Sequence, residues 1–84
     1  MDKENAIVTF DIPKRHMCVD IEIPLDISAD ELVKALNQAY SLEIETANPK
    51  YCYLQAENPI ALLKGNRTLK DFGIRNGSLL RFTK

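Results

Sequence analysis

Long apolar runs, a signal peptide and an excess of charge of either sign are all missing from this 84-residue chain. The longest apolar run is Ile60–Leu63, whereas a bilayer-spanning helix needs about 20 apolar residues. The opening stretch MDKENAIV has no apolar signal core, so we expect a cytoplasmic protein without direct membrane insertion. A formal net charge of −1 argues against nucleic acid as a partner, because nucleic-acid binders present a basic face.

Side chains that perform chemistry are also scarce. The two cysteines, Cys18 and Cys52, lack the close spacing of metal ligands, and reduced cytosolic thiols are their simplest interpretation. His16 is the only histidine, and the polar PKRH segment around it offers no catalytic carboxylate or nucleophile. The three glycines lack phosphate-loop spacing. We therefore predict no enzymatic activity, no cofactor, no metal and no small-molecule substrate.

Two segments near the N-terminus alternate between apolar and polar residues, the pattern of strands with one buried face. Residues 6–12 place Val8, Phe10 and Ile12 on one side, and residues 17–25 do the same with Met17, Val19, Ile21, Ile23 and Leu25. The short polar segment between them predicts a hairpin. Asp20 and Glu22 share the opposite side of the second strand, and we interpret them as surface charges.

A helix is predicted next, because Ser28 and Glu31 have the spacing of a capping box. Apolar residues then recur at helical spacing, as Ala29, Leu32, Val33, Leu36 and Tyr40. Three more strands are predicted: residues 51–56, a short one behind Pro59, and one within the final SLLRFTK. Alternation in residues 51–56 buries Cys52, Leu54 and Ala56 and exposes Tyr51, Tyr53 and Gln55.

One amphipathic helix cannot bury its apolar stripe alone, and a sheet with one apolar face is its natural partner. The order of elements therefore predicts a two-layer α+β domain. The last strand follows a long connection, and a place between the first strand and the strand at residues 51–56 would bury it centrally.

The segment KGNRTLKDFGIRNGSLLRF then points to a family. Together with the order of elements, it resembles the ubiquitin-like β-grasp fold through Leu63, Gly65, Arg67, Thr68, Leu69, Asp71, Ile74, Ser78, Leu80 and Phe82. The resemblance implies a mixed sheet of four to five strands packed on one α-helix, in a single ubiquitin-like domain over residues 1–84 with an ordered core of about 6–83. Within that superfamily the chain is similar to the YukD/EsaB family of Gram-positive type VII (WXG100) secretion systems.

This resemblance implies a function in protein interaction. The chain ends in Arg81-Phe82-Thr83-Lys84 and not in the Gly-Gly tail of ubiquitin-like modifiers, so we expect a non-conjugated accessory or regulatory module. Its expected partners are secretion machinery proteins, which would recruit it to the inner face of the membrane. Two alternatives stay open: a modifier or sulfur carrier processed from a longer precursor, and a ubiquitin-like adaptor unrelated to secretion.

The expected partner-binding surface is the outer face of the sheet, where ubiquitin-like proteins usually dock. With the last strand in the centre, we predict that Thr9, Arg81 and Tyr53 form a row across this face, extended by Leu79 and Tyr51. Tyrosine and arginine are common in interface hot spots. The alternative interpretation is that outward tyrosines only stiffen the sheet as good strand formers.

Overall fold

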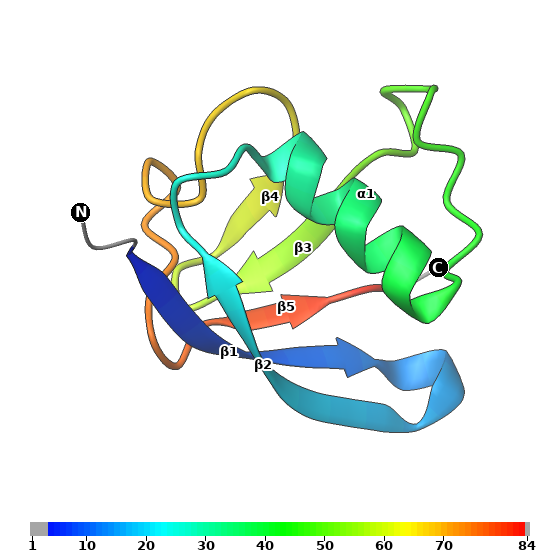
Figure 1. The fold of residues 1–84 in the computed structure, drawn as a ribbon. Helices are drawn as coiled ribbons and strands as arrows, with labels where there is room; N and C mark the ends of the chain where they lie inside the picture. Colours follow the sequence, from blue (N-terminus) through cyan, green and yellow to red (C-terminus); the bar gives the residue numbers. More distant parts are fainter. Residues whose placement is uncertain (1–3, 84) are drawn as a thin grey trace.

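A computed structural model describes residues 4–83, and within that range one α-helix lies across one face of a five-stranded sheet (Figure 1). The strands are β1 (Asn5–Ile12), β2 (Met17–Pro24), β3 (Leu54–Glu57), β4 (Ala61–Leu63) and β5 (Leu79–Arg81). The sheet order is β2-β1-β5-β3-β4. Because β1 and β5 are parallel and the other pairs antiparallel, the sheet is mixed, which confirms the predicted α+β β-grasp architecture.

The hairpin of β1 and β2 forms as the alternation predicted, with an unbroken register from Asn5 opposite Pro24 to Ile12 opposite Met17. A short 3₁₀ turn, η1 (Pro13–Arg15), joins the two strands. Proline fixes φ in the range that such a turn needs. Pro24 ends β2, where its missing N–H does not interrupt the sheet.

The helix α1 (Ala29–Tyr40) begins at the predicted capping box. The Ser28 hydroxyl accepts a hydrogen bond from the Glu31 N–H at 3.1 Å, and the Glu31 carboxylate accepts one from the Ser28 N–H at 3.3 Å. At the other end Arg15 donates to the carbonyl oxygens of Tyr40 and Ser41, so the hairpin holds the helix C-terminus. Both ends of α1 therefore have partners for backbone groups that a helix leaves unpaired.

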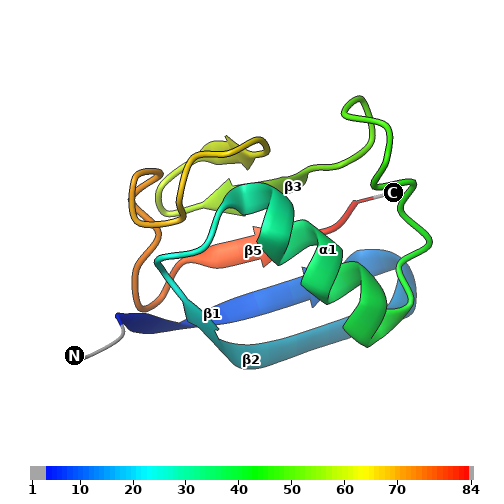
Figure 2. The ribbon, with the colours of Figure 1, turned by 45° about the horizontal axis from the view of Figure 1, so that its top comes forward.

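The core lies between α1 and the inner face of the sheet (Figure 2). Phe10 on β1 and Leu80 on the central strand β5 are fully buried, and Val33 is fully buried on the helix. The segment from Thr68 to Ser78 delivers β5 to the centre of the sheet. Within it the Thr68 hydroxyl accepts a hydrogen bond from the Asp71 N–H at 3.2 Å, and Leu69 is fully buried.

The largest boundary error concerns the third strand. Residues 51–56 were predicted as a strand, but β3 begins at Leu54. The N–H groups of Tyr51 and Cys52 both bond to the Asn48 carbonyl, at 3.0 and 3.2 Å, so this backbone forms a turn. The predicted alternation of burial nevertheless holds through this region, with Cys52 and Leu54 buried and Tyr51 and Tyr53 exposed.

Candidate functional site

The outer face of the sheet, on the side away from α1, is the candidate functional site. Its central strand β5 presents Leu79 and Arg81 outward, because the intervening Leu80 is fully buried. Thr9 on β1 is half-buried on the same side, between the buried Val8 and Phe10. The structure thus places three of the five predicted residues on the strands of this face.

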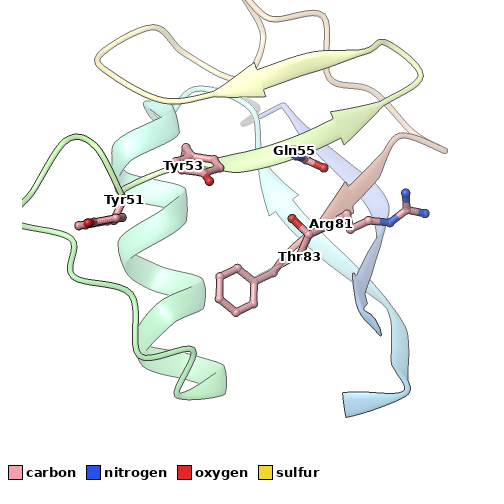
Figure 3. A pocket seen from close by; sticks show the side chains of 6 residues that line it. Tyr51, Tyr53, Gln55, Arg81 and Thr83 are labelled. Atoms are coloured by element: carbon pink, nitrogen blue, oxygen red, sulfur yellow. The ribbon is translucent and has the colours of Figure 1, made fainter. Parts of the chain in front are cut away.

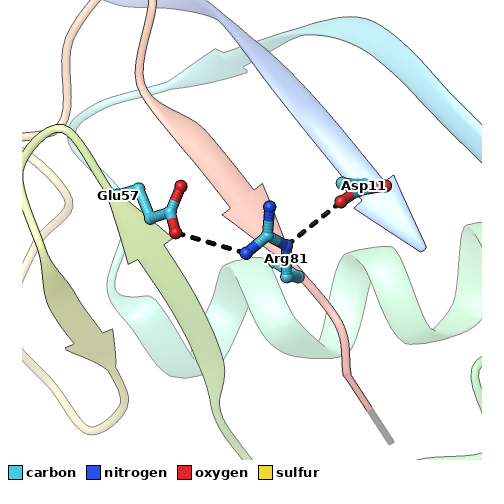
Figure 4. Close-up of polar contacts among 3 residues, drawn as sticks. All are labelled: Asp11, Glu57 and Arg81. Atoms are coloured by element: carbon cyan, nitrogen blue, oxygen red, sulfur yellow. Dashed lines mark hydrogen bonds and ion pairs between the residues drawn. The ribbon is translucent and has the colours of Figure 1, made fainter. Parts of the chain in front are cut away.

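Arg81 is held by two carboxylates from the neighbouring strands (Figure 4). Its Nε lies 3.1 Å from an oxygen of Asp11 on β1, and its Nη1 lies 3.2 Å from an oxygen of Glu57 on β3. The hydrogen bond to Asp11, followed by the charge of Glu57, raises the pKa of the Arg81 guanidinium. The cluster has two negative charges and one positive charge, so Arg81 offers no free positive charge to an anionic ligand.

The predicted row of Thr9, Arg81 and Tyr53 is wrong in its register. Arg81 lies opposite Asp11 on one side and Gln55 on the other, whereas Thr9 and Glu57 flank Leu79. The face therefore has one row of Thr9, Leu79 and Glu57 and another of Asp11, Arg81 and Gln55. Alternation along a strand predicts which of its residues share a face. It does not specify the register, that is, which residues of the neighbouring strand lie opposite them.

Tyr51 and Tyr53 lie beyond the last row, at the end of β5, and line a hollow of about 200 Å³. The other lining residues are Gln55, Arg81, Phe82 and Thr83. Figure 3 shows the two tyrosines on one side of the hollow and Arg81 and Thr83 on the other. Both tyrosines are 37% exposed, so part of each residue reaches solvent while the rest packs on the protein.

Phe82 contributes to both the core and this hollow. It is half-buried against the core cluster, as expected for a residue that shares the face of Leu80. Its N–H donates to the Asp11 carbonyl at 3.0 Å, so the pairing of β5 with β1 continues beyond the strand end. In the sequence, Phe82 contributed only to the family resemblance and was not identified as a lining residue of the site.

Sequence reasoning also missed the apolar residues on the β4 side of the outer face. Ile60 is 90% exposed and Leu62 is 43% exposed, and both lie near Gln55 and Arg81. Leu62 pairs with Gln55 and therefore shares its face. The signal was present in the alternation of the PIALL segment, but the register with β3 was needed to identify the exposed side.

A second hollow lies beside α1, around Cys52, Asp30 and the loop at Gly65. The Cys52 Sγ lies 3.8 Å from Asp30 Oδ1, and that oxygen also accepts a hydrogen bond from the Gly65 N–H at 2.9 Å. Burial, with a smaller contribution from the Asp30 charge, raises the pKa of the Cys52 thiol. A thiol with a raised pKa is a weak nucleophile at neutral pH, so Cys52 has the properties of a packing residue.

No cluster of three or more histidine, cysteine or acidic side chains suited to a metal ion occurs within residues 4–83. In the same range no helix is long and apolar enough to span a membrane. His16 is exposed at the hairpin, where its backbone closes the turn through a hydrogen bond to the Pro13 carbonyl at 3.0 Å.

Comparison with protein families gives a match over most of the chain. The model of the family described as "WXG100 protein secretion system (Wss), protein YukD" matches residues 6–82. These residues include the whole of α1, every strand except the first residue of β1, and every residue that lines the hollow except Thr83. No curated protein sequence gives a significant match.

Solved structures of ubiquitin-like domains share the fold. The C-terminal ubiquitin-like domain of mouse tubulin-specific chaperone e aligns with a TM-score of 0.69 and 11% identity, covering 100% of this chain and 92% of that domain. The ubiquitin-like domain of tubulin-binding cofactor B gives 0.73 and 18%, with coverages of 95% and 89%. The corresponding domain of Plasmodium falciparum Dsk2 gives 0.60 and 19%, with coverages of 93% and 97%. At these identities the likeness concerns the fold alone.

Proposed function

This chain belongs to the YukD family of the WXG100 protein secretion system, and we propose that it acts there as a non-conjugated accessory or regulatory module that docks onto secretion machinery proteins. The family match over residues 6–82 is the observation that supports this most strongly. We place its action in the cytoplasm, with recruitment to the inner face of the membrane through its partners.

The docking surface proposed for this function is the outer face around Tyr51, Tyr53, Leu79, Arg81 and Thr9. The hollow between the tyrosines and β5, at about 200 Å³, is smaller than the roughly 300–1,000 Å³ of typical small-molecule sites. Such a space suits one side chain of a protein partner. Two exposed tyrosines beside it supply the large, partly apolar contact area that interface hot spots use.

The contacts of Arg81 favour an uncharged or apolar anchor in this hollow. Its guanidinium is bound by Asp11 and Glu57, so a phosphate or carboxylate on the partner would have to displace those two carboxylates. Exposed Leu62 and Ile60 extend the apolar surface on the β4 side. The part of the outer face around the hollow and β4 therefore suits a mainly apolar protein surface.

The non-conjugated character is part of this proposal and has a direct test. Phe82 packs on the core and its N–H donates to the Asp11 carbonyl, so this residue is held against the sheet. Intact-mass measurement of the protein from native cells tests this directly. We expect the unmodified mass only, and a covalent adduct would instead support the modifier alternative.

The secretion role is tested by a clean deletion strain in the native host. We expect altered secretion of WXG100 substrates or altered transcript levels of the secretion genes, with restoration by the wild-type chain. Wild-type secretion and transcripts in the deletion strain would contradict the proposed role.

The docking surface is tested by Tyr53→Ala in affinity capture from native cells with solubilised membranes. We expect lower recovery of secretion components, because the substitution removes one wall of the hollow. Lys34→Ala on the exposed side of α1 is the control. Equal recovery by both variants would contradict the assignment of this face.

The variant Arg81→Ala needs a stability measurement beside the capture experiment. It leaves Asp11 and Glu57 without their cation, so its thermal stability must be compared with wild type before its capture is interpreted.

A further inference from the structure

β2 is a long edge strand whose second side is unpaired within residues 4–83. It is eight residues long, stands at the end of the sheet order, and pairs only with β1 (Figure 2). In an antiparallel pair every second residue directs its N–H and C=O away from the partner strand. The opposite edge is different, because β4 has three residues and follows closely after Pro59. β2 is therefore the edge at which a further strand has room to pair.

The inner face of β2 is less buried than that of its partner strand. Met17, Val19 and Ile21 are half-buried, whereas the residues opposite them on β1 are fully buried: Ile12, Phe10 and Val8. The apolar row of β2 thus projects toward the layer of α1 without complete cover. An added strand with apolar residues on this side would extend the core and cover the row.

The outer face of β2 is acidic and its carboxylates are oriented by β1. Thr9 Oγ1 donates to Asp20 Oδ1 at 3.1 Å, and Asn5 Nδ2 donates to Glu22 Oε2 at 3.0 Å. Each carboxylate has further acceptor sites beyond the one it uses. β2 itself contains no lysine or arginine, so this row attracts cations.

From these three features we infer that the β2 edge binds an extended segment of another protein whose residues alternate between apolar and basic. Its backbone pairs with the free side of β2. Its apolar residues lie beside Met17, Val19 and Ile21, and its lysines or arginines lie opposite Asp20 and Glu22.

A second copy of this chain is a poor occupant of the β2 edge. Antiparallel pairing of two β2 strands about Asp20 or Ile21 sets carboxylates opposite carboxylates, and like charges across strands are destabilising. This surface is separate from the tyrosine hollow and does not depend on which secretion component occupies that hollow.

The test uses three synthetic peptides and amide hydrogen exchange measured by NMR. The probes are an alternating Val-Lys heptapeptide, the Val-Glu equivalent, and a Val-Lys peptide with a central proline, all with blocked ends. With Val-Lys we expect saturable binding and slower exchange of alternate amides in β2. We expect binding at least about tenfold weaker with Val-Glu, since two cross-strand charge pairs change sign. The proline peptide should give no protection, because proline cannot continue the ladder.

A charge-swapped variant checks the role of the two carboxylates. The double variant Asp20→Lys with Glu22→Lys should reverse the preference and bind Val-Glu more tightly than Val-Lys. Its control is Glu43→Lys with Glu45→Lys, which changes net charge equally at exposed residues of the loop after α1 and should behave as wild type. Four results would overturn the inference: protection outside β2, equal protection by the proline peptide, no reversal in the charge-swapped variant, or concentration-dependent protection of β2 without any peptide.

Discussion

Leu80 lies on the central strand of the sheet, between β1 and β3, and its side chain is fully buried. We predict that Leu80→Ala lowers the free energy of unfolding by about 2–5 kcal/mol, because it removes apolar contacts and leaves a cavity. Leu62→Ala is the control, since Leu62 is 43% exposed. Urea denaturation of both variants measures the difference, and an unchanged midpoint for Leu80→Ala would remove this residue from the core.

The two thiols differ in exposure, and we predict that they differ in reactivity. Cys18 is exposed, whereas Cys52 is buried with a raised pKa, chiefly through desolvation. In a Cys18→Ser variant, reaction of Cys52 with Ellman's reagent should be more than about tenfold slower than that of Cys18 in wild type. Urea should make Cys52 fully reactive, and rapid labelling of Cys52 in the folded protein would contradict its burial.

The raised pKa of Cys52 also has a consequence for stability. Because the thiolate is disfavoured in the folded protein, the unfolded chain ionises first as the pH rises past the ordinary cysteine pKa of about 8.5. The contribution of this site to stability is thus fully present below that pH and is lost as the pH rises above it.

At the scale of elements, α1 depends on polar contacts at its two ends. We predict that Ser28→Ala lowers the free energy of unfolding by about 0.5–2 kcal/mol, because the Glu31 N–H loses its capping oxygen. The thermal midpoint measured by circular dichroism gives the effect. The control is Gln38→Ala, on the exposed surface of the helix. Ser41→Ala is not a matched control, because the backbone of Ser41 has a positive φ of 53°, unlike that of Ser28. A Ser28 variant as stable as the Gln38 variant would show that the capping box is dispensable.

At the scale of the whole molecule, the parallel pairing of β1 and β5 joins the two ends of the chain at the centre of the sheet. We predict that amides of β1 and β5 exchange with solvent most slowly and that those of residues 43–53 exchange fastest. The backbone hydrogen bonds of strands at the centre of the sheet break only when the whole protein unfolds, whereas those of a surface segment break by local unfolding. Native-state hydrogen exchange measures this, and comparable rates in the two regions would contradict it.

The outer face shows how far the sequence predicts the site. Alternation in β1 and β5 correctly predicts that Thr9, Leu79 and Arg81 point outward. It does not predict that Arg81 binds Asp11 and Glu57, because those contacts depend on the register of three strands. Ile60 and Leu62 were missed for a related reason, since the register of β4 with β3 was needed to identify the exposed side of this short strand.

The sequence by itself determined the elements, the buried faces and the family, because these follow from local hydrophobic period, helix capping and the residues of the Thr68–Ser78 segment. Only the tertiary structure decided which outward residues are neighbours. Strand register and sheet order arise from contacts between residues far apart in the chain, such as Arg81 with Asp11. The hollow beside Tyr53 and the open edge of β2 are products of those long-range contacts, and no local pattern specifies them.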